Sequence, residues 1–165
     1  MSPTNKIDPF GLWTMAIHNR LIRGAFPKLS LNGQWRLTDA SAMVDSLYPG
    51  QLESTAYQHA MSLPGEDPAR AAAKWLQFIQ IQTDKAKTCG TDHWDALWEF
   101  GKGLHALADS TSPAHVGFQP WFWLPTRSEF IAHHRLEEDI SPNDYERTIT
   151  LMRHYYQATF GQKAW

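Results

Sequence analysis

The sequence predicts a single all-α domain, and three observations lead to this prediction. Apolar residues recur at the three- and four-residue spacing of amphipathic helices along most of the chain. No segment alternates apolar and polar residues in the manner of a half-buried strand, and the chain contains neither an internal repeat nor a low-complexity tract. The chain has 165 residues, of which 42% are hydrophobic, so it is long enough to bury a sizeable core within one domain.

The N-terminal segment predicts a leader followed by a helix. Residues 1–12 contain two prolines and a glycine and lack helical periodicity, so we expect them to precede a domain that occupies residues 13–165. Helical periodicity starts at Trp13 and ends near Gly24 and Pro27. The apolar stripe of this helix is formed by Trp13, Ile17, Leu21 and Ile22.

Two further helical segments are expected before residue 62. Residues 28–37 are expected to be irregular. Thr38 or Asp39 is then expected to cap a helix that runs through Tyr48, because both side chains accept hydrogen bonds from free backbone N–H groups. Pro49 and Gly50 break this helix, and another helical segment runs to about Met61.

The remaining helices follow in the second half of the chain. Residues 66–87 predict an amphipathic helix, and the next helix, capped by Thr91 or Asp92, runs to about Ser110 before Pro113. An aromatic loop is expected over 113–126, followed by helices over about 127–138 and 142–159. Ser141 is the N-cap of the last helix and Pro142 its first residue. The stripe of the 66–87 helix is expected to be Ala72, Leu76, Ile79 and Thr83.

Composition limits the classes of function. The formal net charge is −2 and the isoelectric point about 6.4, which argues mildly against a nucleic-acid substrate. Cys89 is the one cysteine, so no internal disulfide can form, and a metal could stabilise the fold instead. No apolar run reaches the roughly 18 residues of a membrane span, and the first residues lack the apolar region of a signal peptide.

Eight histidines are present, and their spacing indicates a metal site. His105 and Asp109 lie four residues apart on an expected helix, so both side chains project from one face. His115 follows just beyond the expected helix end at Pro113, which gives the spacing H-x3-D-x5-H. A neutral imidazole is the commonest protein ligand of zinc. Three more histidines and two acids extend the pattern: His18, the pair Asp45 and His59, and the pair His134 and Glu138.

Each of these elements also has an ordinary structural interpretation. A histidine four residues before an acid is usually a surface pair, and His18 or His59 alone would be a half-buried imidazole with hydrogen-bond partners. His133 competes with His134, because His133 and Glu137 have the same spacing. His93 and His154 are expected to be structural or exposed to solvent. The prediction of a metal site therefore rests on the number of ordered pairs, because no single pair would be sufficient.

The ordered set resembles the zinc-dependent phospholipase C and single-strand nuclease superfamily, whose members are all-α and hold three zinc ions. The resemblance covers residues 13 to about 138 and is most specific over 105–115. It implies one zinc held by Asp45, His59, His105 and Asp109. It implies a second held by His115, His134 and Glu138, and a third held by His18 and Trp13 with Asp109 bridging. In this family the tryptophan that matches Trp13 is the mature N-terminus, whereas twelve residues precede it here.

Those twelve residues carry a second resemblance. The segment NKIDPFGL is similar to the end of the core of Rhs repeat proteins, where the shell cuts itself after a DPxGL motif. We therefore expect cutting between Leu12 and Trp13, with Asp8 acting within the motif, to free Trp13 and complete the third zinc site. The shell of the parent Rhs protein is an expected partner.

The two resemblances imply an antibacterial toxin domain that hydrolyses phospholipid phosphoesters. Such a domain would be delivered by a contact-dependent route such as type VI secretion, act at the periplasm or inner membrane of the target cell, and be neutralised by a cognate immunity protein. Glu138 favours the phospholipase branch, and the Trp13–His18 spacing favours the nuclease branch, so a zinc nuclease is the alternative enzyme. The non-enzymatic alternative is a membrane-binding or pore-forming toxin with a structural metal site.

Catalytic roles are expected for two of the acids and a substrate role for the aromatic loop. Asp45 and Asp109 are the candidate catalytic residues, Asp45 as the base or orienter of a water molecule. Hydrogen-bond acceptors for the imidazoles are expected among Glu53, Glu137 and Asp139. The aromatic loop is interpreted either as a lipid-interface element or as core packing or a lid, and its aromatics could also stack on bases. Its large side chains are Phe118, Trp121, Phe122 and Trp123.

Overall fold

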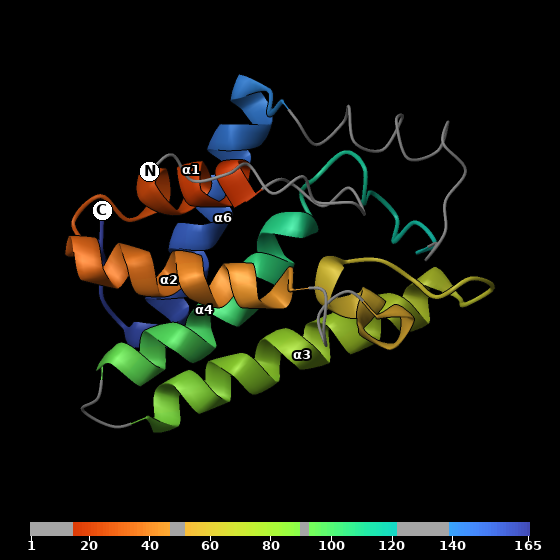
Figure 1. The fold of residues 1–165 in the computed structure, drawn as a ribbon, viewed down its shortest axis with the longest axis horizontal. Helices are drawn as coiled ribbons and strands as arrows, with labels where there is room; N and C mark the ends of the chain where they lie inside the picture. Colours follow the sequence, from red (N-terminus) through yellow and green to blue (C-terminus); the bar gives the residue numbers. More distant parts are fainter. Residues whose placement is uncertain (1–14, 47–51, 90–92, 122–138) are drawn as a thin grey trace.

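The computed structural model describes residues 15–46, 52–89, 93–121 and 139–165, and these residues form helices joined by turns (Figure 1). The described part contains no β-strand, and an isolated parallel bridge joins Ser62 to Pro120. The predicted all-α class is therefore confirmed. The expected helix over 127–138 lies outside the described residues.

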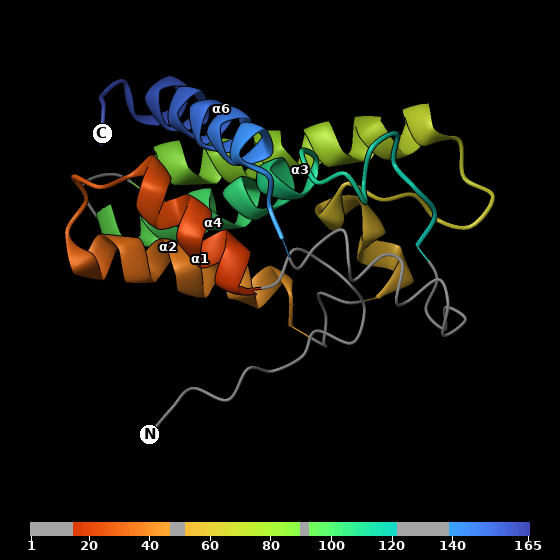
Figure 2. The same ribbon diagram turned by 90° about the horizontal axis from the view of Figure 1, so that it is seen from above.

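The helix α4 (His93–Asp109) forms the centre of the molecule. It packs between α2 (Leu31–Val44) on one side and α3 (Pro68–Thr88) on the other, as the two views in Figures 1 and 2 show. The helices α1 (Met15–Ala25) and α6 (Pro142–Phe160) pack against each other, and the short 3-10 helix η1 (Glu53–His59) packs against α3 and α4. This arrangement leaves the C-terminal end of α4 surrounded by other elements.

The sequence of α4 explains its central position. Eleven of its seventeen residues are buried, because apolar or small residues cover most of its circumference. Gly101 permits a close approach to α2: a Cβ atom there would lie 2.7 Å from the Cβ of Ala40 and 3.1 Å from the carbonyl oxygen of Leu37. The main core gathers around Phe100 and Leu104, with Leu21, Leu37 and Tyr156 from the other helices and Phe26 just after α1.

The region before Thr38 differs from the prediction. Residues 28–37 were expected to be irregular, but α2 already begins at Leu31, where the Ser30 side chain accepts a hydrogen bond from the backbone N–H of Gly33 at 3.1 Å. Ser30, and neither Thr38 nor Asp39, is therefore the N-cap. Gly33 interrupts the apolar pattern, yet its position is buried and a Cβ there would make ordinary contact with Leu97. The first part of α2 was missed because a glycine occupies one of its buried positions.

The start of α6 follows the prediction. Ser141 caps α6 by accepting from the backbone N–H of Asp144, and Pro142 is its first residue, as expected.

The buried face of α3 differs in part from the expected one. Of the expected stripe, Leu76 is 60% exposed and Ala72 is half-buried. The residues that α3 buries are Ala71, Ile79, Gln82, Thr83 and Ala86.

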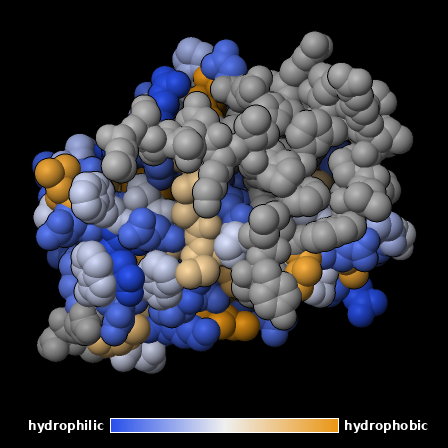
Figure 3. All heavy atoms as spheres, in the orientation of Figure 1, coloured by the Kyte–Doolittle hydropathy of each residue, from blue (hydrophilic) through white to orange (hydrophobic). Residues whose placement is uncertain are grey.

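The described residues visible on the face in Figure 3 are mainly hydrophilic, and hydrophobic side chains form small separate areas there. Large hydrophobic residues that are exposed include Leu31, Trp35 and Met43 on α2. Among the described helices, none combines the length and the apolar composition that crossing a membrane requires.

Candidate metal centre

The C-terminal end of α4 carries two of the predicted ligands. His105 and Asp109 lie one turn apart, and Nε2 of His105 is 3.0 Å from Oδ2 of Asp109. Both side chains are fully buried. The helix ends at Asp109, and Arg147 of α6 fixes the following turn by donating to the carbonyl oxygen of Thr111 at 2.7 Å. The pair is therefore buried next to a turn that is tied to α6.

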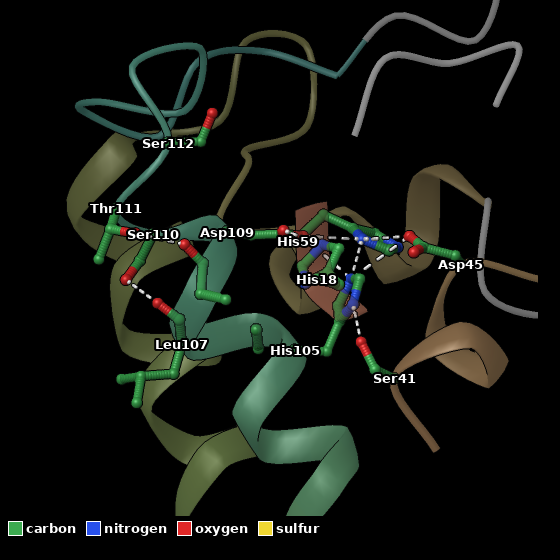
Figure 4. A network of polar contacts seen from close by, with 12 residues as sticks. His18, Ser41, Asp45, His59, His105, Leu107, Asp109, Ser110, Thr111 and Ser112 are labelled. Atoms are coloured by element: carbon green, nitrogen blue, oxygen red, sulfur yellow. Dashed lines mark hydrogen bonds and ion pairs between the residues drawn. The ribbon is translucent and has the colours of Figure 1, made fainter. Parts of the chain in front are cut away.

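Three further predicted ligands reach this pair from three different elements. Asp45 follows the last residue of α2, His59 is the last residue of η1, and His18 lies on α1. Figure 4 shows the three imidazoles between the carboxylates of Asp109 and Asp45. The fold thus brings together residues that are up to 91 positions apart in the chain, between His18 and Asp109.

Five separations among donor atoms of this cluster are close to those of a tetrahedral metal site. Zinc bonds of about 2.0–2.1 Å place tetrahedral donors about 3.3 Å from one another. The separations that involve an imidazole nitrogen range from 3.0 to 3.9 Å. They join Nδ1 of His59 and Nε2 of His105 to each other and to carboxylate oxygens of Asp45 and Asp109. This cluster of buried His and Asp side chains could bind a metal ion.

Asp109 also faces a second group of donors. Its Oδ1 atom lies 3.0 Å from Nε2 of His18, while its Oδ2 atom faces His59 and His105. The rings of His18 and His105 are stacked, with their centroids 4.4 Å apart. His18, His105 and Asp109 therefore form a second candidate group. A neutral imidazole has one lone pair, so His105 can serve one ion, whereas the two oxygens of Asp109 can serve two.

Burial controls the charge of the two central residues. Removal from water lowers the pKa of His105 to about 3, so its imidazole is neutral and able to donate a lone pair. Burial by itself would raise the pKa of Asp109, but the adjacent His105 and His18 lower it well below its ordinary value. The site therefore presents a neutral imidazole beside an ionised carboxylate, which are the protonation states that metal binding requires.

Of the four other predicted ligands, one belongs to the part of the chain that the structure describes and three lie outside it. His115 is 1% exposed and follows α4 through a turn in which its backbone N–H donates to the carbonyl oxygen of Ser112 at 3.0 Å. It does not belong to either donor group defined above. Trp13, His134 and Glu138 lie outside the described residues, as do the rival pair His133 and Glu137.

The aromatic loop contacts the candidate metal centre through Trp121. Trp121 is 2% exposed, and its ring stacks on His59 with a centroid distance of 5.7 Å. Its backbone N–H donates to the carbonyl oxygen of Ser62 at 2.7 Å, which anchors the loop next to η1. The lipid-interface interpretation is therefore wrong for Trp121, because its side chain is packed against the cluster. Phe118 is half-buried against Trp75, while Phe122 and Trp123 lie outside the described residues.

The hydrogen-bond partner of His105 is one that the sequence did not indicate. Glu53 and Asp139 were expected as acceptors, but both are exposed. Instead, Oγ of Ser41 lies 3.1 Å from Nδ1 of His105, and both residues are 1% exposed. Ser41 precedes Asp45 by four residues, so helical spacing would have placed it on the face of α2 that carries this ligand. His93 and His154 are exposed to solvent, as expected.

Comparison of the chain with models of protein families, with curated proteins and with solved structures finds no match in any of the three.

Proposed function

We propose that this chain is a zinc-dependent phosphoric ester hydrolase. The observation that carries the proposal is a buried cluster in which donor atoms of Asp45, His59 and His105 lie 3.1–3.9 Å apart. An oxygen of Asp109 lies 3.0 Å from Nε2 of His105 and 3.3 Å from Nδ1 of His59. Two imidazole nitrogens with two carboxylate oxygens suit zinc better than magnesium or calcium, which prefer sites made of oxygen alone. Further histidines, His18 and His115, are buried close to Asp109 in space or sequence. Structural zinc sites are usually closed by four ligands, so this surplus favours catalysis.

The two carboxylates suit different roles. The side chain of Asp109 is fully buried, whereas that of Asp45 is 8% exposed and its Oδ1 lies 3.4 Å from His105 and 3.9 Å from His59. When bound, zinc supplies positive charge to a phosphoester and lowers the pKa of water. Asp109 would hold the metal, and Asp45 would hold it more loosely and orient a water molecule. His59 and His105 would serve as neutral ligands.

A phospholipid is the proposed substrate, and a nucleic acid is the second candidate. The resemblance of Glu138 to the phospholipase branch and the net charge of −2 support the first. The Trp13–His18 spacing supports the second. Burial of Trp121 removes one argument for a lipid interface, so the choice between the two substrates depends on experiment.

Hydrolysis of two substrates, with and without a chelator, tests the proposed function. Wild-type protein is incubated with phosphatidylcholine or phosphatidylethanolamine vesicles and, separately, with single-stranded DNA. We expect release of phosphorylated headgroup that stops on addition of chelator. Asp109→Asn should lower the rate at least about 100-fold, because it removes the central anionic ligand. Asp39→Asn, an exposed position on α2, is the matched control. Cleavage of DNA alone would support the nuclease, and hydrolysis of neither substrate would support a non-enzymatic toxin.

We further propose that release from an Rhs carrier completes a third metal position at Trp13. Two observations support this proposal. His18 on α1 lies 3.0 Å from Asp109, and α1 begins at Met15, two residues after Trp13 in the sequence. The proposal places the domain in an antibacterial effector with a cognate immunity protein and action at the periplasm or inner membrane of the target cell. Mass spectrometry of the toxin released from the full-length carrier should show Trp13 as its first residue. Any other first residue would contradict this route.

A further inference from the structure

Ser41 contacts the candidate metal centre but does not itself offer a typical zinc ligand. We propose that Ser41 is a positioning residue, whose hydroxyl sets the tautomer and the direction of His105 so that Nε2 faces the metal. The inference rests on the proposed metal site and deepens it. Its basis is the 3.1 Å contact between Oγ of Ser41 and Nδ1 of His105 within the closely packed α2–α4 pair.

The location of Ser41 links two ligands through one helix. Ser41 lies on α2 four residues before Asp45, so a single helical face carries the hydroxyl and the carboxylate. Both reach His105 on α4 from this face: Ser41 contacts Nδ1, and Oδ1 of Asp45 lies 3.4 Å from Nε2. Figure 4 shows Ser41 and Asp45 reaching the His105 ring from different directions. The ring is therefore fixed at both nitrogens.

The chemistry of the neutral imidazole gives this contact a consequence for metal binding. A neutral ring carries one N–H and one lone pair. Without metal, Nε2–H can donate to Oδ2 of Asp109 at 3.0 Å, and Nδ1 then accepts from the hydroxyl of Ser41. With metal, Nε2 needs its lone pair, so the proton must reside on Nδ1 and the oxygen of Ser41 must accept it.

A hydroxyl is suited to both states because it can donate or accept one hydrogen bond by rotating about its C–O bond. A backbone carbonyl or a carboxylate in this position could only accept, and an ammonium group could only donate. Ser41 therefore lets His105 change tautomer when metal binds without leaving a buried ring nitrogen unsatisfied. A buried nitrogen that lost its partner would cost free energy in one of the two states.

Zinc affinity of four proteins tests the role of Ser41. Competition with a chromophoric chelator gives the zinc dissociation constant of wild type, Ser41→Ala, Ser41→Thr and Thr38→Ala. Thr38 is the matched control, because it lies on the same helix and its hydroxyl donates to the carbonyl oxygen of Trp35. We expect Ser41→Ala to weaken zinc binding about 10- to 100-fold, the usual effect of removing such a partner. Ser41→Thr should retain most of the affinity, and Thr38→Ala should stay within about twofold of wild type.

Equal zinc affinities of Ser41→Ala and Thr38→Ala would overturn the proposal. A second measurement uses the wild-type protein alone and so does not depend on the folding of a variant. Nitrogen-15 NMR of the zinc-loaded protein should show His105 protonated at Nδ1, and protonation at Nε2 would contradict the proposal. A wild-type chain that binds zinc but hydrolyses no phosphoester would contradict the proposed function and leave the role of Ser41 intact.

Discussion

His105 is the residue on which the candidate centre depends most. Its two ring nitrogens face four polar side chains, and its ring stacks on His18. Few substitutions preserve such a position, since each neighbour requires a defined atom of the imidazole. The polar contacts of His105 come from two other elements and from its own helix: Ser41 and Asp45 at α2, His59 in η1, and Asp109 in α4.

Burial of His105 predicts a pH dependence of stability in the absence of metal. Its pKa is about 3 in the folded protein, compared with 6.5 for an ordinary imidazole, so the unfolded chain binds more protons between these values. The free energy of unfolding should therefore fall as the pH drops below about 6.5, by at most about 1.4 kcal/mol per pH unit for one proton. Urea unfolding in chelator from pH 6.5 to 5 measures this slope. His105→Gln should reduce it, and an unchanged slope would assign the effect to other groups.

The site could be predicted from the sequence only where its ligands follow a regular spacing. His105 and Asp109 are four residues apart on one helix, and the other ligands were identified through their pairing and the resemblance. Helical spacing to Asp45 places Ser41 on the ligand face of α2, but the contact of Ser41 with His105 and that of Trp121 with His59 cross the fold and do not follow from spacing. The expected acceptors Glu53 and Asp139 failed for the same reason: sequence proximity does not give the direction of a side chain.

At the scale of elements, the contact between α2 and α4 determines whether the ligands meet. Asp45 and Ser41 belong to the α2 side, and His105 and Asp109 to α4. The two helices are in close contact at Gly101, one turn before His105. A change in this spacing would alter the separation of donor atoms on the two helices, which a metal site tolerates poorly.

Gly101→Ala tests this contact. Replacing a helical glycine by alanine normally stabilises a helix by about 1 kcal/mol. Here the new Cβ would lie 2.7 Å from that of Ala40, so overpacking should prevail and destabilise the protein by about 1–3 kcal/mol. The control is Gly33→Ala, where the nearest atom is 3.4 Å away and a neutral or stabilising effect is expected. Denaturant unfolding gives both values, and stabilisation by Gly101→Ala would contradict the described packing.

The junction of α3, α4 and α6 predicts a second pH effect. Burial raises the pKa of Tyr155 to about 12 from the ordinary value of 10, although its hydroxyl bonds Oγ1 of Thr83 at 2.9 Å. The folded protein therefore keeps a proton that the unfolded chain loses, so the resulting stability is present below pH 10 and is lost as the pH rises toward 12. Tyr155→Phe should flatten the decline in the free energy of unfolding above pH 10. An equally steep decline in this variant would exclude Tyr155 as its cause.

The bounds and buried faces of the helices could be predicted where the capping residues and the apolar periodicity indicated the same helix. Ser141 and Pro142 marked the start of α6, and the stripe of α1 was buried at Ile17, Leu21 and Ile22. The start of α2 was missed because Gly33 occupies a contact position that a large residue fills in most helices. Leu76 on α3 is apolar but exposed, since the partner helices contact a neighbouring face.

At the scale of the whole molecule, metal binding should stabilise the fold. The candidate ligands come from α1, α4, η1 and the end of α2, so an ion bound by Asp45, His59 and His105 would connect three of these elements. Ligands that bind the folded state alone add about 2.7 kcal/mol at a concentration of 100 times Kd. For a chain of this length, that raises Tm by about 5–10 °C.

Thermal unfolding with and without zinc measures this coupling. The wild-type protein should show the rise in Tm, whereas His105→Gln should show little of it, because it loses a central ligand. A rise of the same size in both proteins would indicate that zinc stabilises the chain at another place.

The zinc content of the purified chain tests the existence of the metal centre most directly. The protein is loaded with zinc, freed of unbound metal by gel filtration, and analysed by mass spectrometry of the elements. We expect at least one zinc per wild-type chain and a similar content in Asp39→Asn. Asp109→Asn should lose most of the zinc, because the carboxylate that it removes lies 3.0 Å from both His18 and His105. A wild-type chain that retains no zinc, or an Asp109→Asn variant that retains as much as wild type, would contradict the proposed metal centre.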